Sequence, residues 1–198
     1  VYGKLARASK SLSLGFLEET TAAMEALWPA GAKAAAEPAS LDGLTVVNLD
    51  GKKIKRAAKR LKPLRGTPGK VFGGKLLAAH LPSSGLVAAM AADPDGEAND
   101  IKLVPEALRR ARARIPGPRL WVADRQFCDL DQPRRFSEEG DHFLTRFSRK
   151  TGFHPDSERP SIASRDRRGW IIIEEWGWIG AADDERRRWV RRITLRRP

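Results

Sequence analysis

The sequence predicts an α/β fold in which a mixed β-sheet with flanking helices is followed by a β-rich segment. Apolar runs separated by turn residues occupy residues 44–94 and predict three successive strands. Helical and strand patterns then alternate to about residue 148, and two long apolar stretches after about residue 160 flank a short polar loop. With 198 residues and 41% hydrophobic content, the chain is long enough to bury the core of one domain.

The first predicted element is a helix. Apolar residues recur at helical spacing over residues 12–28, and GAKAAAEPAS at residues 31–40 is typical of a linker. We therefore expect residues 1–40 to form a helical N-terminal segment and a linker. Because the chain opens on Val1 and stops at Pro198 directly after a strand-like pattern, we also expect both termini to be cut.

Three strands are predicted next. LTVVNLD at residues 44–50 predicts a strand that ends at an Asp50-Gly51 turn. Residues 72–82 and 85–94 predict two more strands, and the proline, serines and glycine between them predict a hairpin-like loop.

Helices and strands alternate in the middle of the chain. Residues 99–115 predict a helix that Asn99 or Asp100 caps and that Pro116 stops. After it the pattern predicts a strand, a short helix and another strand, at residues 119–124, 129–140 and 142–148. The last predicted element is an antiparallel hairpin that pairs residues 169–180 with residues 186–195.

The charge balance indicates the kind of partner. The chain carries 37 Lys+Arg against 25 Asp+Glu, a formal charge of +12, which favours binding to polyanions. Nucleic acid is the leading partner, and an anionic membrane surface is the alternative. No window approaches the length of a membrane span, so we expect no membrane insertion. Because Cys128 is the single cysteine and no signal-peptide pattern is present, we expect a reducing cytoplasm.

Basic residues cluster in three places that are candidates for DNA contact. Such contacts to phosphate would be independent of base sequence and strongly dependent on salt. The alternative for the first cluster, after residue 51, is a solvated loop or helix face. The candidate DNA-binding residues are Lys52, Lys53, Lys55, Arg56, Lys59, Arg60, Arg125, Arg146, Arg149, Lys150, Arg191 and Arg192.

Two aspartates follow predicted strands. Asp50 ends the first strand and Asp124 ends the fourth, and these strands are neighbours in several mixed folds, so the two carboxylates could meet. Paired carboxylates suit Mg²⁺ or Mn²⁺, which prefer oxygen ligands. For Asp50 the alternative is ordinary turn chemistry, because Asp-Gly also follows strands in turns. Asp129 and Asp131 are better explained as helix-capping residues than as ligands.

Four segments together resemble a known family. They are NLDGKKIKR at residues 48–56, LWVADRQFCD at 120–129, HFLTRFSRK at 142–150 and the late EEWGWIG and RRRWVRRITL pair. In this order they resemble the bacterial insertion-sequence DDE transposases, which carry an all-β insertion inside an RNase H-like core. The resemblance covers about residues 40–198. It implies an RNase H-like core over residues 41–158 and a β-rich insertion over residues 159–198, both partial.

The resemblance also implies the chemistry. The first two catalytic, metal-binding carboxylates of the family match Asp50 and Asp124, with Mg²⁺ or Mn²⁺ as cofactor. The third is a glutamate on a helix after the insertion, within a tyrosine-arginine-glutamate-lysine signature. We expect this chain to be truncated before that helix, and we do not assign the role to Glu174 or Glu175, which lie in the insertion-like hairpin. Related enzymes hold a flipped base on aromatic side chains, so Trp170, Trp176 and Trp178 are base-stacking candidates; the alternative is that they form the hairpin's own core.

The function that the resemblance implies is metal-dependent DNA strand cleavage and strand transfer in cut-and-paste transposition. Its partners would be double-stranded DNA, as transposon ends and target, and a second copy in a homodimeric transposition complex. Its location would be the bacterial cytoplasm, in association with the nucleoid. Two alternatives stay open: an inactive DNA-binding transposase remnant, and a metal-dependent nuclease of RNase H-like fold. Binding without nicking would favour the remnant, and Mg²⁺-dependent nicking by the isolated chain would favour the nuclease.

Overall fold

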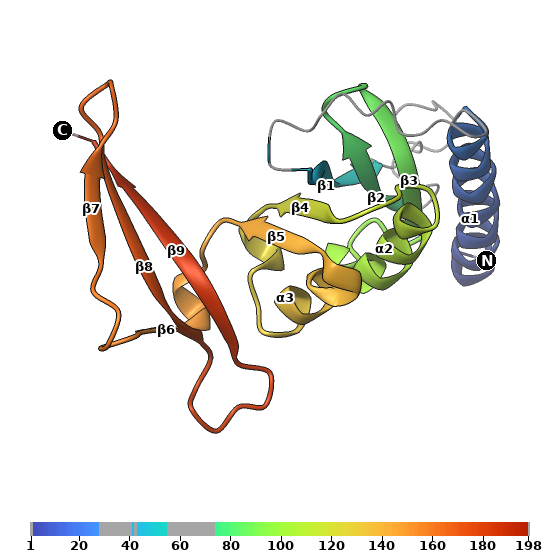
Figure 1. Cartoon of the computed structure of the whole chain (residues 1–198). Helices are drawn as coiled ribbons and strands as arrows, with labels where there is room; N and C mark the ends of the chain where they lie inside the picture. The colour runs from blue at the N-terminus through green and yellow to red at the C-terminus, as the bar shows by residue number, and fades with distance from the viewer. Residues whose placement is uncertain (1, 28–40, 42, 55–73, 198) are drawn as a thin grey trace.

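The computed structural model describes residues 2–27, 41, 43–54 and 74–197. In this part of the chain two β-sheets lie one after the other, with helices packed only around the first (Figure 1). The α-helices are α1 (Tyr2–Ala26), α2 (Val104–Arg112) and α3 (Asp131–Phe136). No helix of the described residues is long and apolar enough to cross a membrane.

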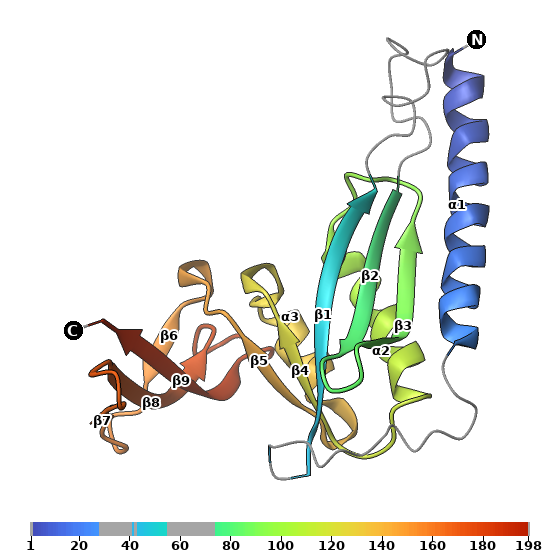
Figure 2. The same ribbon diagram turned by 90° about the horizontal axis from the view of Figure 1, so that it is seen from above.

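The first sheet has five strands in the order β3-β2-β1-β4-β5 (Figure 2). The strands β1, β2 and β3 form an antiparallel meander, and β4 and β5 run parallel to β1 on its other side. This mixed sheet with flanking helices confirms the predicted α/β, RNase H-like fold. The strand bounds are Thr45–Ile54 for β1, Gly74–Leu81 for β2, Leu86–Asp93 for β3, Arg119–Ala123 for β4 and His142–Thr145 for β5.

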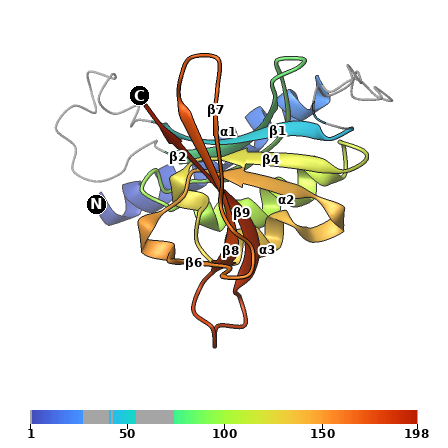
Figure 3. The same cartoon turned by 60° about the vertical axis from the view of Figure 1, so that its left-hand side comes forward.

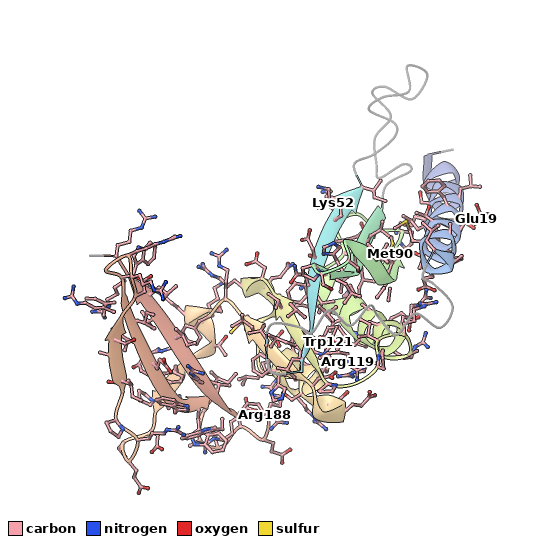
Figure 4. The ribbon with its side chains drawn as sticks, turned by 45° about the horizontal axis from the view of Figure 1, so that its top comes forward. Glu19, Lys52, Met90, Arg119, Trp121 and Arg188 are labelled. Atoms are coloured by element: carbon pink, nitrogen blue, oxygen red, sulfur yellow. The ribbon has the colours of Figure 1, made fainter. Side chains whose placement is uncertain are left out.

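One face of this sheet, which we call the inner face, carries the hydrophobic core. Val47 and Leu49 of β1 lie beside Trp121 and Ala123 of β4, and all four are buried. The apolar side of α2 covers this face, because Val104, Ala107, Leu108 and Ala111 recur at helical spacing and are buried. Figure 4 shows Trp121 in the packed region between the sheet and its covering helices.

The opposite, outer face is covered at one edge by α1. Leu17 of this helix is buried, and its Cδ1 lies 2.6 Å from the position that a Cβ on Gly74 would take, so the helix and β2 approach closely. Met90 of β3 lies between the sheet and α1 (Figure 4). The predicted N-terminal helix is therefore present, but it begins at Tyr2 instead of residue 12. The sequence did not reveal its first turns because they lack a clear apolar period.

The predicted turn at Asp50-Gly51 is wrong. Both residues lie inside β1, which continues to Ile54. The strand continues because its second half pairs with β2, from Asp50 opposite Ala78 to Ile54 opposite Gly74. Asp50 is therefore held by the backbone ladder of a strand, and only the parallel pairing with β4 stops just before it.

The remaining predictions for the first sheet agree with the structure. The loop between β2 and β3 turns through Gly85 at φ 71°, a conformation that glycine adopts without strain. The predicted helix after residue 99 begins as a 3-10 helix, η3 (Asp100–Leu103), and continues as α2. Asn99 caps it, because its side chain accepts a hydrogen bond from the N–H of Ile101.

The second sheet is built around β8 (Ile171–Ile179). The predicted hairpin partner is β9 (Arg188–Arg196), which pairs with β8 along its whole length. The other edge of β8 pairs with β6 (Phe153–Pro155) and β7 (Ile162–Arg165), two short strands that the sequence did not predict. This sheet thus begins before residue 159. Figure 3 shows that β8 and β9 run across the direction of β1, β4 and β5.

Candidate active site

The two candidate carboxylates follow the last registered pair of two parallel strands. Thr45 is registered with Arg119, and the pairing continues to Leu49 with Ala123. Asp50 and Asp124 are the next residue of each strand. Because side chains alternate along a strand and Leu49 and Ala123 face the core, both aspartates point to the outer face. The structure thus brings together the two residues that the sequence selected, at the edge of the sheet that we expected.

The surroundings of the two carboxylates differ. Asp50 is exposed, and its carboxylate makes no hydrogen bond or ion pair with another residue of the described part of the chain. Asp124 is also exposed, and its Oδ1 accepts a hydrogen bond of 2.6 Å from the N–H of Arg125. This bond caps the 3-10 helix η4 (Arg125–Phe127). Asp50 therefore belongs to a strand, and Asp124 begins a short helical turn.

Arg146 extends this row to a third strand. Thr145, the last residue of β5, is registered with Ala123, so Arg146 follows β5 as Asp124 follows β4. Nη1 of Arg146 lies 3.4 Å from Oδ1 of Asp124, and the two side chains are 69% and 62% exposed. An ion pair this exposed contributes at most about 1 kcal/mol to stability. The guanidinium consequently remains accessible to a phosphate.

The carboxylate pair fits a divalent metal ion in the type of its donors. Both residues offer oxygen atoms to solvent, and Mg²⁺ and Mn²⁺ prefer oxygen ligands and keep several waters when few protein ligands are present. Within the described residues no group of three or more histidine, cysteine, aspartate or glutamate side chains is arranged to hold a metal. The protein ligands that this part of the chain can offer here are therefore the two aspartates.

The basic candidates are distributed around this edge and beyond it. Lys52 and Lys53 lie in β1 just after Asp50 and are exposed, and Lys53 pairs with Glu97 (Figure 4 labels Lys52). Arg125 is the exposed first residue of η4. Arg149 and Lys150 are exposed in the 3-10 helix η6 (Arg149–Thr151). Lys55, Arg56, Lys59 and Arg60 lie outside the described residues.

The arginines of the second sheet are engaged within the protein. Arg191 pairs with Glu174 at 2.5 Å, and Arg192 pairs with Glu175 at 2.7 Å, across the β8–β9 ladder. These contacts also explain the two glutamates, which serve cross-strand pairs. Their charges offset the arginines locally, so this surface is less basic than the sequence suggests.

The candidate tryptophans carry arginines on their rings. The guanidinium carbon of Arg159 lies 3.9 Å from the ring centroid of Trp176, and that of Arg187 lies 4.0 Å from Trp178. Trp170 has Arg197 at 5.4 Å. These are cation–π contacts, so a DNA base would have to use the other ring face or displace an arginine. Their base-stacking role stays a prediction.

The capping prediction for Asp129 and Asp131 holds for one of the two residues. Asp129 lies just before α3, and its Oδ1 accepts hydrogen bonds from the N–H groups of Asp131 and Gln132. Asp131 is the first residue of α3, and its carboxylate lies 3.6 Å from Arg186. Cys128 is a free cysteine and is buried. In contrast, the sequence analysis considered Asp100 only as a helix cap. In the structure it is a buried carboxylate that contacts both Lys75 and Gln126. The one hint in the sequence is Gly51, because the carboxylate of Asp100 lies where a side chain at position 51 would be.

The fold and this part of the sheet define a class of protein: RNase H-like domains that carry neighbouring aspartates on two parallel strands. The comparison with protein families narrows the class, since the transposase DDE domain matches residues 42–196. The chain belongs to this family and is a transposase catalytic domain. Transposase domains of this family generally use divalent metal ions.

The comparison with solved structures gives a weaker likeness. A cryo-EM structure described as a piggyBac transposase synaptic complex with hairpin DNA matches at 14% sequence identity with a TM-score of 0.39. The match covers 66% of this chain and 30% of that one, so this chain spans about a third of the length of that relative. A likeness of this size carries no further structural argument. The search among curated proteins found no match.

Proposed function

We propose that Asp50 and Asp124 are catalytic carboxylates that hold divalent metal ions, Mg²⁺ or Mn²⁺, at a site for DNA strand cleavage and strand transfer. The observation that supports this is their position: both follow the last registered pair of β1 and β4, and both are exposed on the outer face. When bound, such ions activate the attacking oxygen and stabilise the leaving oxygen of a phosphodiester.

The proposed reaction is cut-and-paste transposition, in two displacements at phosphorus. In the first, a water oxygen bonds to a DNA phosphorus as the P–O3′ bond breaks. The water loses a proton to solvent and O3′ gains one from solvent, which leaves a 5′-phosphate and a 3′-hydroxyl. In the second, that 3′-hydroxyl oxygen bonds to a phosphorus of the target as the target's P–O3′ bond breaks; the attacking hydroxyl loses its proton to solvent, and the released O3′ gains one. Asp50 and Asp124 fix the reacting site on the sheet, and Arg146 offers its guanidinium to a phosphate.

The proposed partners are double-stranded DNA, as transposon ends and as target, and a second copy of the chain in a transposition complex. The net charge of +12 supports the first partner. The exposed cations that we propose as phosphate contacts are Lys52, Arg125, Arg146, Arg149 and Lys150. Lys53 is left out because it lies on the inner face of β1 and pairs with Glu97. For location we propose the bacterial cytoplasm, near the nucleoid.

The test is a titration of the ¹⁵N-labelled chain with Mn²⁺, followed by NMR. Manganese broadens the amide signals near its binding site, and this readout detects weak binding by a site with two protein ligands. We expect broadening around residues 50 and 124, and its loss in Asp50→Asn combined with Asp124→Asn. Asp183→Asn, which changes an exposed carboxylate in the β8–β9 loop, is the matched control and should leave the pattern unchanged. Equal broadening in the double variant would refute the proposed site.

The two alternatives are outcomes of a second measurement on the same proteins. DNA nicking in Mg²⁺ that needs Asp50 and Asp124 but no transposon end would indicate a nuclease. DNA binding with no nicking and no Mn²⁺ site would indicate a DNA-binding remnant. Strand transfer that depends on a transposon end and on both aspartates is the result that the proposal predicts.

A further inference from the structure

Asp100 is a buried carboxylate on the inner face of the first sheet. It is the first residue of η3 and is only 4% exposed. Its Oδ1 lies 2.7 Å from Nζ of Lys75 in β2, and its Oδ2 accepts a hydrogen bond of 2.7 Å from Nε2 of Gln126. Burial of an ionised carboxylate is unfavourable unless partners compensate for the lost water. An ionised aspartate at position 100 therefore has a desolvation cost that an apolar residue would not have.

The carboxylate lies directly against the strand that carries Asp50. A Cβ placed on Gly51 would lie 2.4 Å from Oδ2 and 2.7 Å from Oδ1 of Asp100, closer than real Cβ atoms come to oxygen. Glycine at position 51 is thus required for this contact. Because Gly51 follows Asp50 and points to the inner face, Asp100 supports the backbone of β1 from behind the sheet, at the residue next to the candidate ligand.

The same carboxylate is bonded to the turn that carries Asp124. Gln126 is the second residue of η4, whose first backbone N–H is bonded to the Asp124 side chain. Two further hydrogen bonds form this turn, from the N–H of Phe127 to the carbonyl of Asp124 and from the N–H of Cys128 to the carbonyl of Arg125. The bond from Gln126 to Asp100 therefore attaches η4 to η3, whose Asp100 lies against β1 at Gly51.

Lys75 adds the third attachment. It lies in β2 opposite Lys53 of β1, and its side chain is 17% exposed. Although its ammonium lies close to Oδ1 of Asp100, that oxygen has no well-aligned hydrogen-bond donor within the described residues. Gln126 on Oδ2 is thus the directional contact of the carboxylate, and Lys75 mainly neutralises its charge.

We propose that Asp100 is a positioning residue, which fixes the spacing between Asp50 and Asp124 by joining β1, β2 and η4 behind the sheet. It does not touch the metal or the DNA in this role. The inference rests on the proposed function, because a fixed spacing matters only if the two aspartates share a ligand. Residues that orient metal ligands typically change metal affinity by about 10- to 100-fold when they are replaced.

The experiment compares Asp100→Asn and Gln126→Ala with Asp141→Asn. Asp141 is the matched control, since it is also a buried carboxylate, bonded to Arg112, Arg119 and Trp121. It directly precedes β5 beside the beginning of β4, at the opposite end of that strand from Asp124. The first readout is Mn²⁺ affinity of the folded protein, well below each variant's melting temperature. The second is native-state hydrogen exchange of the Phe127 and Cys128 amides, which needs no metal.

We expect Asp100→Asn to weaken Mn²⁺ binding about tenfold, with faster exchange at Phe127 and Cys128. Gln126→Ala should shift both readouts in the same direction by a smaller factor. It changes a side chain outside the core, so it carries the test if Asp100→Asn does not fold. Asp141→Asn should lower the melting temperature without changing either readout in the folded protein.

Wild-type affinity and exchange in Asp100→Asn, or in a folded Gln126→Ala when Asp100→Asn does not fold, would overturn the inference. Equal effects of Asp141→Asn would also overturn it, because general destabilisation would then explain the result. Failure of the proposed function is distinguishable: wild-type protein would show no Mn²⁺ site that depends on Asp50 and Asp124. In that case the exchange rates alone decide whether Asp100 holds the turn.

Discussion

The first sheet buries most of its apolar side chains between layers, whereas the second leaves many of its own partly exposed. In the first, Trp121, Val47 and Leu77 have no exposed surface. In the second, the buried apolar side chain of β8 and β9 is Ile179, and four large apolar residues are 42–59% exposed: Ile162, Trp189, Ile193 and Leu195. By strand register these four share one face of the sheet.

The second sheet is stabilised more by polar contacts between its strands than by a buried core. Cross-strand ion pairs and arginine–aromatic contacts run along it, as in the Arg192 guanidinium 4.0 Å from the Phe153 ring. Such contacts are individually weaker than burial of a large side chain. The sheet that carries the two aspartates is therefore held by a buried core, which gives both residues a stable support. The second sheet has a surface suited to contact with another molecule.

Replacement of Trp121 should destabilise the protein more than any other change considered for the two sheets. Trp121→Ala leaves a cavity in the first sheet's core and removes the 2.9 Å hydrogen bond from Nε1 to Asp141. We expect the free energy of unfolding to fall by about 3–5 kcal/mol. Urea denaturation followed by circular dichroism measures it. Trp121→Phe, which keeps most of the volume, should cost less, and a loss below about 1 kcal/mol for the alanine variant would contradict the burial argument.

A smaller effect is expected for Trp178 in the second sheet. Its ring lies 5.5 Å from that of Trp189 in an edge-on arrangement, with Arg187 over it. Trp178→Ala should cost about 1–2 kcal/mol, because it removes contacts but little fully buried area. The same urea experiment applies. A loss as large as that of Trp121→Ala would mean that both sheets depend on burial equally, and the comparison would fail.

DNA binding should depend more on the cations beside the two aspartates than on the arginines of the second sheet. Lys52→Ala with Arg146→Ala removes two exposed cations beside the carboxylates, and each lost phosphate contact lowers the salt slope of log K by about 0.9. Arg191→Ala with Arg192→Ala should change the slope less, since Glu174 and Glu175 already pair with these arginines. Fluorescence anisotropy with duplex DNA at several salt concentrations measures it. Arg109→Ala, on α2, is the control and should leave the salt slope unchanged. A larger change in slope for Arg191→Ala with Arg192→Ala than for Lys52→Ala with Arg146→Ala would place the DNA on the second sheet.

The smallest expected effect is on Glu106 in α2. The guanidinium of Arg109, hydrogen-bonded to this carboxylate, lowers the pKa of Glu106 from 4.5 to about 2, with Arg110 contributing. A carboxylate with a lowered pKa stabilises the fold above its unfolded pKa and loses that contribution as the pH falls from about 4.5 to about 2. Because the side chain is 40% exposed, solvent screening limits the effect of Glu106→Gln to under about 1 kcal/mol at pH 7. Thermal melts at pH 7 and pH 2.5 should show the difference shrinking in acid.

The sequence predicted the five strands around the core and the β8–β9 hairpin because these segments are apolar and bounded by turn residues. It missed β6 and β7, whose residues FHP and IASR are short, partly polar and largely exposed. These strands exist because β8 offers an unpaired edge, which is a tertiary property. The extension of β1 beyond Asp50 has the same origin, since only pairing with β2 distinguishes it from a turn.

The candidate site also contains some residues that could be predicted from the sequence and others that could not. Asp50 and Asp124 could be selected from sequence because each follows an apolar run, and their meeting depends only on the neighbouring strands that were assumed. Asp100 and Asp141 could not be selected, because nothing local distinguishes a buried carboxylate from a cap or a loop residue. Their roles depend on partners such as Gln126 and Arg119, which come from other elements.

The continuation of β1 to Ile54 has a mechanical consequence. Asp50 belongs to a strand that pairs with β2 both before and after this residue, so its backbone is held in place. Asp124 is carried by a three-residue turn, which is the more compliant support. The position of Asp50 is therefore set by strand pairing alone, whereas the position of Asp124 also depends on the hydrogen bond between Gln126 and Asp100. We expect loss of that bond to move Asp124 and to leave Asp50 in place.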